Sequence, residues 1–123
     1  MEVTRLADAK PYEAPKHFDM RGLRLQGFDA SGAESFWVGL SNFLPGGGAE
    51  MDGTPIEKVY VVVEGEVTIV TEEGETVLGR FDSVRLAPGE VRAVENRTNL
   101  PALMLVVMPY PGGPAEPARS REP

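Results

Sequence analysis

The side chains that most often bind transition metals or act as nucleophiles are scarce in this sequence. It contains no cysteine and one histidine, His17, in the segment Pro15-Lys16-His17-Phe18. Thiolate ligands, a cysteine nucleophile and disulfides are therefore excluded, and His17 has no second histidine with which to form a metal pair. We interpret His17 as a surface or strand-edge residue rather than a catalytic one. Polar chemistry must come mainly from charged and hydroxyl side chains.

The elements that would position such side chains are short strands. The sequence has 14 glycines and 11 prolines, spaced at short intervals between β-branched and aromatic runs, a pattern typical of many strands joined by turns. We predict an all-β chain without a long helix. A loop is expected at Pro45-Gly46-Gly47-Gly48, and the expected strands are residues 21–28, 34–44, 57–63, 66–71, 76–79, 82–86, 91–96 and 102–108.

Charge and hydropathy exclude several classes of partner. The net charge is -7, from 12 Lys+Arg against 19 Asp+Glu, and no basic cluster offsets it. Such a chain repels nucleic acid backbones and anionic membranes. The apolar stretches are too short to span a bilayer, and the first residues lack the pattern of a secretory signal. We therefore expect a cytoplasmic protein without a nucleic acid or membrane partner.

Two clusters of residues resemble the two conserved motifs of the cupin superfamily. Leu44-Pro45-Gly46-Gly47-Gly48 is similar to the glycine-rich start of the first motif, and residues 57–66, which end in Glu64-Gly65-Glu66, are similar to its second half. Residues 82–96, with Pro88-Gly89 followed at the right spacing by Asn96, are similar to the second motif. The resemblance covers roughly residues 36–108. It implies a double-stranded β-helix, or jelly-roll, barrel.

This resemblance also suggests how the chain is divided. Residues 1–20 would be an N-terminal extension, 21–108 the cupin barrel and 109–123 a tail rich in proline and glycine. Because such a tail has little to bury and cannot continue a sheet, we expect it to be mobile. In the alternative, Pro109-Tyr110-Pro111 packs along the barrel or against a partner subunit, with Tyr110 as the anchor.

Metal-binding cupins hold their metal with histidines and a glutamate at set positions of both motifs. The matching positions here are occupied by Asp52, Thr54, Lys58 and Arg92. With a gap one residue longer, the first two would be Met51 and Gly53. Lysine and arginine are cationic donors that repel a divalent ion. The resemblance therefore predicts a barrel without a metal or another cofactor.

Strand alternation extends this prediction along the chain. If Lys58 points into the barrel like the residue it replaces, Tyr60 and Val62 also point inward, while Val59, Val61 and Val63 face outward. The same reasoning places Arg92, Val94 and Asn96 inside. The pocket would then combine Lys58 and Arg92 with Tyr60, Asp52 and Thr54, and Trp37 could contribute to its wall.

Three functions are compatible with such a pocket, and the sequence leaves open whether the chain is an enzyme. In the leading hypothesis, Lys58 and Arg92 bind a small organic anion such as a carboxylate. The second is a lyase or isomerase in which Lys58 and Tyr60 perform acid–base or Schiff-base chemistry. The third is a dimeric scaffold whose barrel is plugged by salt bridges from Asp52 or Glu50 to the cations.

The outward valines also bear on assembly. A row of valines on the outside of a barrel requires a cover, either a second sheet or another subunit. Because cupins commonly dimerise through such faces, the resemblance favours a homodimer.

Overall fold

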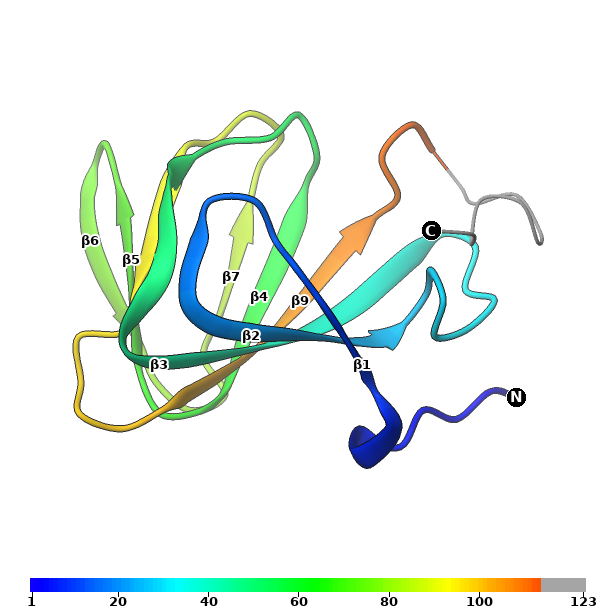
Figure 1. Ribbon diagram of the computed structural model, residues 1–123. Coiled ribbons are helices and arrows are strands. Elements are labelled where there is room, and N and C mark those ends of the chain that lie inside the picture. Colours follow the sequence, from blue (N-terminus) through cyan, green and yellow to red (C-terminus); the bar gives the residue numbers. More distant parts are fainter. Residues whose placement is uncertain (114–123) are drawn as a thin grey trace.

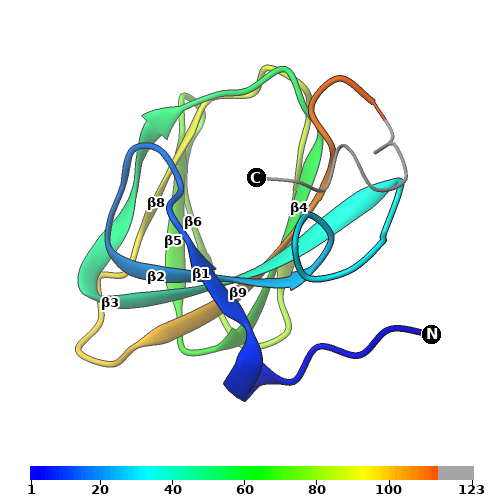
Figure 2. The same ribbon diagram turned by 45° about the vertical axis from the view of Figure 1, so that its right-hand side comes forward.

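The computed structural model describes residues 1–113 and consists of one strongly bent β-sheet that forms a nearly closed barrel (Figures 1 and 2). The strand order is β6-β5-β8-β3-β9-β4-β7, with β2 paired to β3 and β1 paired to β2. The strands are β1 (Lys10–Tyr12), β2 (His17–Gln26), β3 (Phe36–Asp52), β4 (Lys58–Glu64), β5 (Val67–Thr71), β6 (Gly74–Leu78), β7 (Ser83–Leu86), β8 (Arg92–Glu95) and β9 (Ala102–Pro109). The predicted all-β jelly-roll architecture is confirmed.

Helical structure is minimal. Within residues 1–113 the helical element is the 3-10 turn η1 (Leu6–Asp8), and this part of the chain has no helix long and apolar enough to cross a membrane.

The expected loop at Pro45-Gly46-Gly47-Gly48 is wrong, because β3 continues through it as a single 17-residue strand. The first half of β3 pairs with β9 and the second half with β8, so the strand passes from one part of the sheet to the other. A Cβ atom on Gly47 would lie 2.1 Å from the Asp19 carbonyl oxygen, and one on Gly48 would lie 2.0 Å from the Val94 carbonyl oxygen. Gly47 and Gly48 therefore permit close backbone packing, whereas Gly46 adopts a φ of 83° with open space around it.

The strand expected at residues 21–28 also differs. β2 begins earlier, at His17, and ends at Gln26, and β1 adds a further strand before it. Both belong to the same sheet. Part of the segment expected to be an extension is thus integrated into the sheet.

The predicted alternation along β4 and β8 is confirmed. Lys58, Tyr60 and Val62 are buried, with exposed fractions of 4%, 3% and 0%, whereas the intervening valines are half-buried. Arg92, Val94 and Asn96 are also buried. Both strands therefore present one face to the interior of the barrel.

Tyr110 packs against the barrel, as in the alternative prediction for the C-terminal segment. Its side chain is buried, accepts a hydrogen bond from the Phe28 backbone N–H at 3.2 Å and donates one to the Ala33 carbonyl. The sheet itself continues to Pro109. The predicted mobility of the tail concerns mainly residues 114–123, which lie outside the described residues.

Candidate functional site

A cavity of about 260 Å³ opens inside the barrel, and all five side chains predicted to form a site line it. Lys58 and Tyr60 come from β4, Arg92 from β8, Asp52 from the end of β3, and Thr54 from the segment that follows. The inner wall is mostly apolar, with Val94, Met104, Val106, Met108 and Trp37. Polar groups thus converge on an apolar hollow, the usual composition of a small-molecule site. That these residues bind a ligand stays a prediction.

Arg92 is held rigidly by neutral oxygen atoms. Its Nε donates to the Tyr60 hydroxyl at 2.9 Å, and its Nη1 donates to the backbone carbonyls of Glu50 and Asp52 at 3.2 and 3.3 Å. Within residues 1–113 these bonds leave Nη2 without a recorded hydrogen bond. The guanidinium is therefore fixed in place while its charge remains uncompensated.

Lys58 is a second buried cation without a counter-ion. No carboxylate of residues 1–113 lies within 4.0 Å of its Nζ. Burial lowers the pKa of Lys58, and Arg92 lowers it further, whereas Asp52 acts in the opposite direction. Both buried cations therefore face the same cavity.

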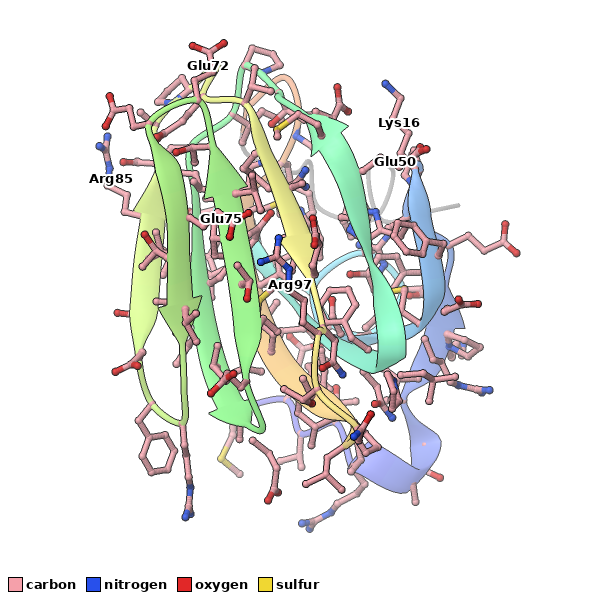
Figure 3. All side chains as sticks on the ribbon, turned by 90° about the vertical axis from the view of Figure 1, so that its left-hand side faces the viewer. Lys16, Glu50, Glu72, Glu75, Arg85 and Arg97 are labelled. Atoms are coloured by element: carbon pink, nitrogen blue, oxygen red, sulfur yellow. The ribbon has the colours of Figure 1, made fainter. Side chains whose placement is uncertain are left out.

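The predicted salt-bridge plug is not formed by the described residues. Asp52 pairs instead with Lys16 at 3.4 Å, and both side chains are substantially exposed. Glu50 lies on the surface near Lys16 (Figure 3). Glu50 and Asp52 do contact Arg92, but only through their backbone carbonyls. Partial loss of solvent alone would raise the pKa of Asp52, but hydrogen bonds from the Gly53 backbone and Lys16 lower it below the usual value.

Thr54 and Tyr60 supply the hydroxyl groups. Thr54 lies at the rim and donates a hydrogen bond to the Ile56 carbonyl at 3.4 Å. Burial raises the pKa of Tyr60, with Arg92 opposing the shift. Tyr60 is therefore a neutral phenol at physiological pH that can donate its proton into the cavity.

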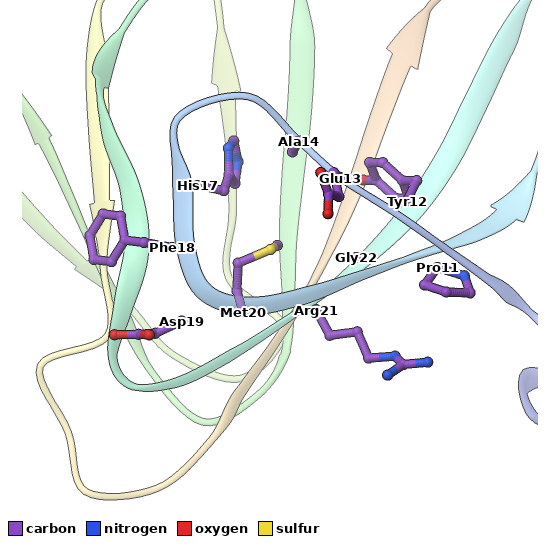
Figure 4. A pocket seen from close by; sticks show the side chains of 10 residues that line it. All are labelled: Pro11, Tyr12, Glu13, Ala14, His17, Phe18, Asp19, Met20, Arg21 and Gly22. Atoms are coloured by element: carbon purple, nitrogen blue, oxygen red, sulfur yellow. The ribbon is translucent and has the colours of Figure 1, made fainter. Parts of the chain in front are cut away.

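The N-terminal segment forms a wall of the cavity, which the sequence analysis missed. Tyr12, Glu13, Ala14, Pro15 and His17 all line it. Figure 4 shows this segment running from β1 into β2, with His17 and Phe18 on opposite sides of the strand. Burial lowers the pKa of His17, a hydrogen bond to the Pro15 carbonyl raises it, and Arg92 and Lys58 lower it again. His17, interpreted from the sequence as a surface or strand-edge residue, is the first residue of β2 and also lines the cavity.

Arg24 is a third cation of the cavity wall and was also missed. Two glycines, Gly22 and Gly39, are the features of the sequence that reflect the packing of Tyr12 beside Arg24. A Cβ on Gly39 would lie 2.6 Å from the Tyr12 hydroxyl, and one on Gly22 would lie 3.0 Å from the Tyr12 ring. These glycines make room for Tyr12 beside Arg24, but the sequence does not reveal which side chain fills the space.

The donor set does not fit the metal that the motif positions imply. Asp52 and Thr54 offer oxygen atoms, but Lys58 and Arg92 are cationic at the other two positions. Within residues 1–113 no group of three or more His, Cys, Asp or Glu side chains is arranged to hold a metal ion.

Comparison with known families and proteins agrees with the architecture. Residues 39–108 match the family described as "Cupin domain". β-D-galactosidase Rv1717 of Mycobacterium tuberculosis is 49% identical over 111 residues, which cover 90% of this chain and 96% of that protein.

Solved structures share the fold at low sequence identity. The polyketide cyclase RemF from Streptomyces resistomycificus has a TM-score of 0.80 and 18% identity, covering 98% of this chain and 89% of that one. A sugar phosphate isomerase of the cupin superfamily from Silicibacter pomeroyi has a TM-score of 0.74 and 24% identity. The match covers 87% of this chain and 74% of that one. At these identities the likeness concerns the fold alone.

Proposed function

The chain belongs to the cupin family, and we propose that it binds a small organic anion, specifically a sugar acid, inside its barrel. One observation carries the proposal. Lys58 and Arg92 are 4% and 6% exposed and line the cavity, and no carboxylate of residues 1–113 lies within 4.0 Å of either. A buried cation without a partner is unfavourable, and an anionic ligand would remove that cost.

The arrangement of donors supports a carboxylate as the anionic group. Arg92 is fixed by hydrogen bonds to the Tyr60 hydroxyl and two backbone carbonyls. These bonds do not use Nη2 of Arg92 or the Lys58 ammonium, so both can donate to a ligand. A planar carboxylate can accept from an arginine nitrogen and an ammonium together. Because the arginine is already ordered, little further conformational entropy is lost when the ligand binds.

The relative supports a sugar as the body of the ligand. A protein named as a β-D-galactosidase is 49% identical across nearly the whole chain, and the cavity of about 260 Å³ has the size for a monosaccharide rather than a larger ligand. Galacturonate is a galactose-type ring that bears a carboxylate. Its ring corresponds to the sugar named for the relative, and its carboxylate is complementary to the cations that line the cavity.

Calorimetric titration of galacturonate and galactose into the ligand-free protein tests the proposal. We expect galacturonate to bind measurably, and Lys58→Met to weaken it by roughly tenfold or more, since one charge-assisted hydrogen bond is lost. Lys10→Met, on the exposed strand β1, is the matched control and should bind like the parent. Equal binding of galacturonate by the parent and Lys58→Met would refute the proposal.

A second function, hydrolysis of β-D-galactosides, is favoured specifically by the 49% identical relative. Glycosidases commonly use two carboxylic acids, and Glu13 and Asp52 both line the cavity. The lowered pKa of Asp52 keeps it ionised at neutral pH, which suits a base or nucleophile. Release of nitrophenol from nitrophenyl β-D-galactoside should then fall at least a hundredfold in Asp52→Asn, and unchanged turnover would eliminate Asp52 from this role.

The lyase or isomerase hypothesis retains one supporting feature, the lowered pKa of Lys58. A neutral lysine amine can form a Schiff base with a carbonyl substrate. Borohydride trapping of an aldose or keto acid on Lys58, followed by mass spectrometry, tests it, and absence of any adduct across such substrates would argue against it.

We also propose a homodimer formed through the outer face of the barrel. The register places Val61, Leu105, Leu40 and Leu23 in one outward row across β4, β9, β3 and β2. An apolar row across four strands matches a second copy of the same face. Light scattering should give a dimer mass for the parent and a monomer mass for Leu105→Asp, whereas Val77→Asp on the exposed strand β6 should remain dimeric. A monomeric parent would contradict this.

A further inference from the structure

Arg24 is a cation held in an aromatic cage inside the barrel. Its Cζ lies 4.0 Å from the centroid of the Tyr12 ring, 3.9 Å from that of Phe28 and 4.8 Å from that of Trp37. Rings at these distances stabilise the guanidinium through cation–π contacts and cover its flat faces. Only the edge of the guanidinium, with its N–H groups, remains to receive an acceptor.

One of those N–H groups has no acceptor among residues 1–113. Nη1 of Arg24 is buried and has no hydrogen-bond partner, and no carboxylate of the described chain lies within 4.0 Å of the guanidinium. A buried, charged donor without an acceptor is unfavourable. The cage compensates the charge in part, but it cannot supply the missing hydrogen bond.

Arg24 and the Lys58–Arg92 pair are separated across the cavity wall. The register places Tyr60, Val106, Gly39 and Arg24 in one inward row over β4, β9, β3 and β2. Three strand spacings of about 4.8 Å separate the ends of this row by roughly 14 Å along the wall. Arg92 bonds to Tyr60 at one end of the row, and Arg24 forms the other end. The cavity between them is lined by Val106 and Trp37.

The backbone is adapted to build the cage. Phe28 has a φ of 50°, a left-handed conformation that is unfavourable for an aromatic residue. In this conformation its ring meets Arg24, Trp37 at 5.6 Å and Tyr110 at 5.0 Å between centroids. Strain of this kind persists where the surrounding structure holds it in place, and such positions cluster at functional sites.

We propose that Arg24 is a second ligand-binding residue and that the ligand therefore carries two acidic groups, one at the Lys58–Arg92 pair and one at Arg24. This inference rests on the proposed function, because it assumes that the first pair binds an acid. The ligand class is a diacid of hexose size. Its second carboxylate accepts from Nη1 and lies in the plane of the guanidinium, between the rings that cover the two faces.

Titration calorimetry with two matched probes tests the inference. Galactonate is an open six-carbon chain with one carboxylate, and galactarate is the same open chain with two. We expect the ligand-free parent protein to bind galactarate about tenfold more tightly than galactonate, because one additional charge-assisted hydrogen bond forms. Arg24→Gln should abolish this ratio by lowering the affinity for galactarate to that for galactonate.

Two further variants keep the test interpretable. Arg24→Lys retains the positive charge within the cage, and should keep a preference for galactarate even if Arg24→Gln is poorly folded. Arg21→Gln is the matched control, since Arg21 lies on the same strand and is exposed, and it should keep the full ratio.

The possible failures are distinguishable. If the parent binds galacturonate but binds galactonate and galactarate equally, or if Arg24→Gln leaves the ratio unchanged, the role of Arg24 is refuted while the proposed function is retained. If the parent binds none of the three acids, the proposed function fails and this inference fails with it.

Discussion

The two ends of the barrel treat buried polar groups in opposite ways. At one end, which we call the closed end because its Asn96 does not line the cavity, the Asn96 amide donates to the carbonyls of Phe43 and Leu100 at 3.1 and 2.8 Å. Its oxygen accepts from the backbone and hydroxyl of Thr98 at 3.0 and 2.8 Å. At the cavity end, which we call the open end, Lys58 has no carboxylate partner and a nitrogen of Arg24 has no acceptor within residues 1–113.

This difference separates a structural polar group from a site. Asn96 and Arg92 are both inward residues of the same part of the chain, at and just beyond the ends of β8. The chain satisfies Asn96 completely, as folding stability requires. It leaves the cations at the other end incompletely satisfied, which is unfavourable for the free protein and favourable for binding an anion.

Asn96→Ala is expected to give the largest effect. It removes the hydrogen bonds of a fully buried side chain and leaves the Phe43 and Leu100 carbonyls without that donor. The free energy of unfolding should fall by about 2–3 kcal/mol, measured by urea denaturation. Asn99→Ala, in the exposed loop nearby, is the control and should change little. A loss no larger than that of the control would mean that the closed end is not maintained by this network.

Lys58→Met is expected to have the opposite sign. Methionine fills a similar volume without a charge, so the ligand-free protein should become more stable by about 1–2 kcal/mol. The same variant should lose binding of galacturonate. Comparison of melting temperatures with Lys10→Met isolates the effect of burial. A destabilised Lys58→Met would show that the lysine has a structural role, and the contrast between the two ends would then be wrong.

The sign of the pH dependence gives a smaller, independent effect. Because burial and Arg92 lower the pKa of Lys58 below 10.5 in the folded protein, the unfolded chain binds more protons between that lowered pKa and 10.5. Stability of the ligand-free protein should therefore rise with pH through this window, and anion affinity should fall. Denaturation curves at several alkaline pH values measure the first. Lys58→Met should lack this contribution, and an identical profile in both proteins would contradict it.

The local pattern of the sequence was sufficient for the inward faces of the barrel. Alternation along β4 is strict, so one anchor residue determines the orientation of Lys58, Tyr60 and Val62. The glycines at 46–48 led to the wrong prediction, because composition favours a turn there. The close approach of Gly47 and Gly48 to the carbonyls of Asp19 and Val94 involves segments distant in sequence and is not encoded locally.

The remaining part of the site depends on tertiary contacts in the same way. Arg24 lies in the strand predicted at residues 21–28, but Tyr12 and Trp37 of its cage belong to other segments, and Phe28 lies in the turn that follows the actual end of β2 at Gln26. The pairing of Asp52 with Lys16 rather than with Lys58 likewise follows from where β2 begins. Motif spacing identified the cavity residues contributed by the two motifs, but it could not identify those contributed by the N-terminal segment and β2, or which cations have a compensating partner.

Arg97→Gln is expected to have the smallest effect, although Arg97 has the most complete set of ion pairs on the surface. It bonds to Glu75 through two nitrogens at 2.8 Å and to Glu95 at 2.8 Å (Figure 3). These groups are exposed, so water and salt screen their attraction, and ordering the long side chains offsets most of the gain. The melting temperature should remain within experimental scatter at both low and high salt, and anion binding should be unchanged. A loss of stability comparable to that of Asn96→Ala would show that the number of charge contacts matters more than their burial. If no such loss occurs, burial decides how much a charged side chain affects stability and binding. Among the described residues, Lys58 has fewer charged partners than Arg97, yet its substitution is expected to have the larger effect on both.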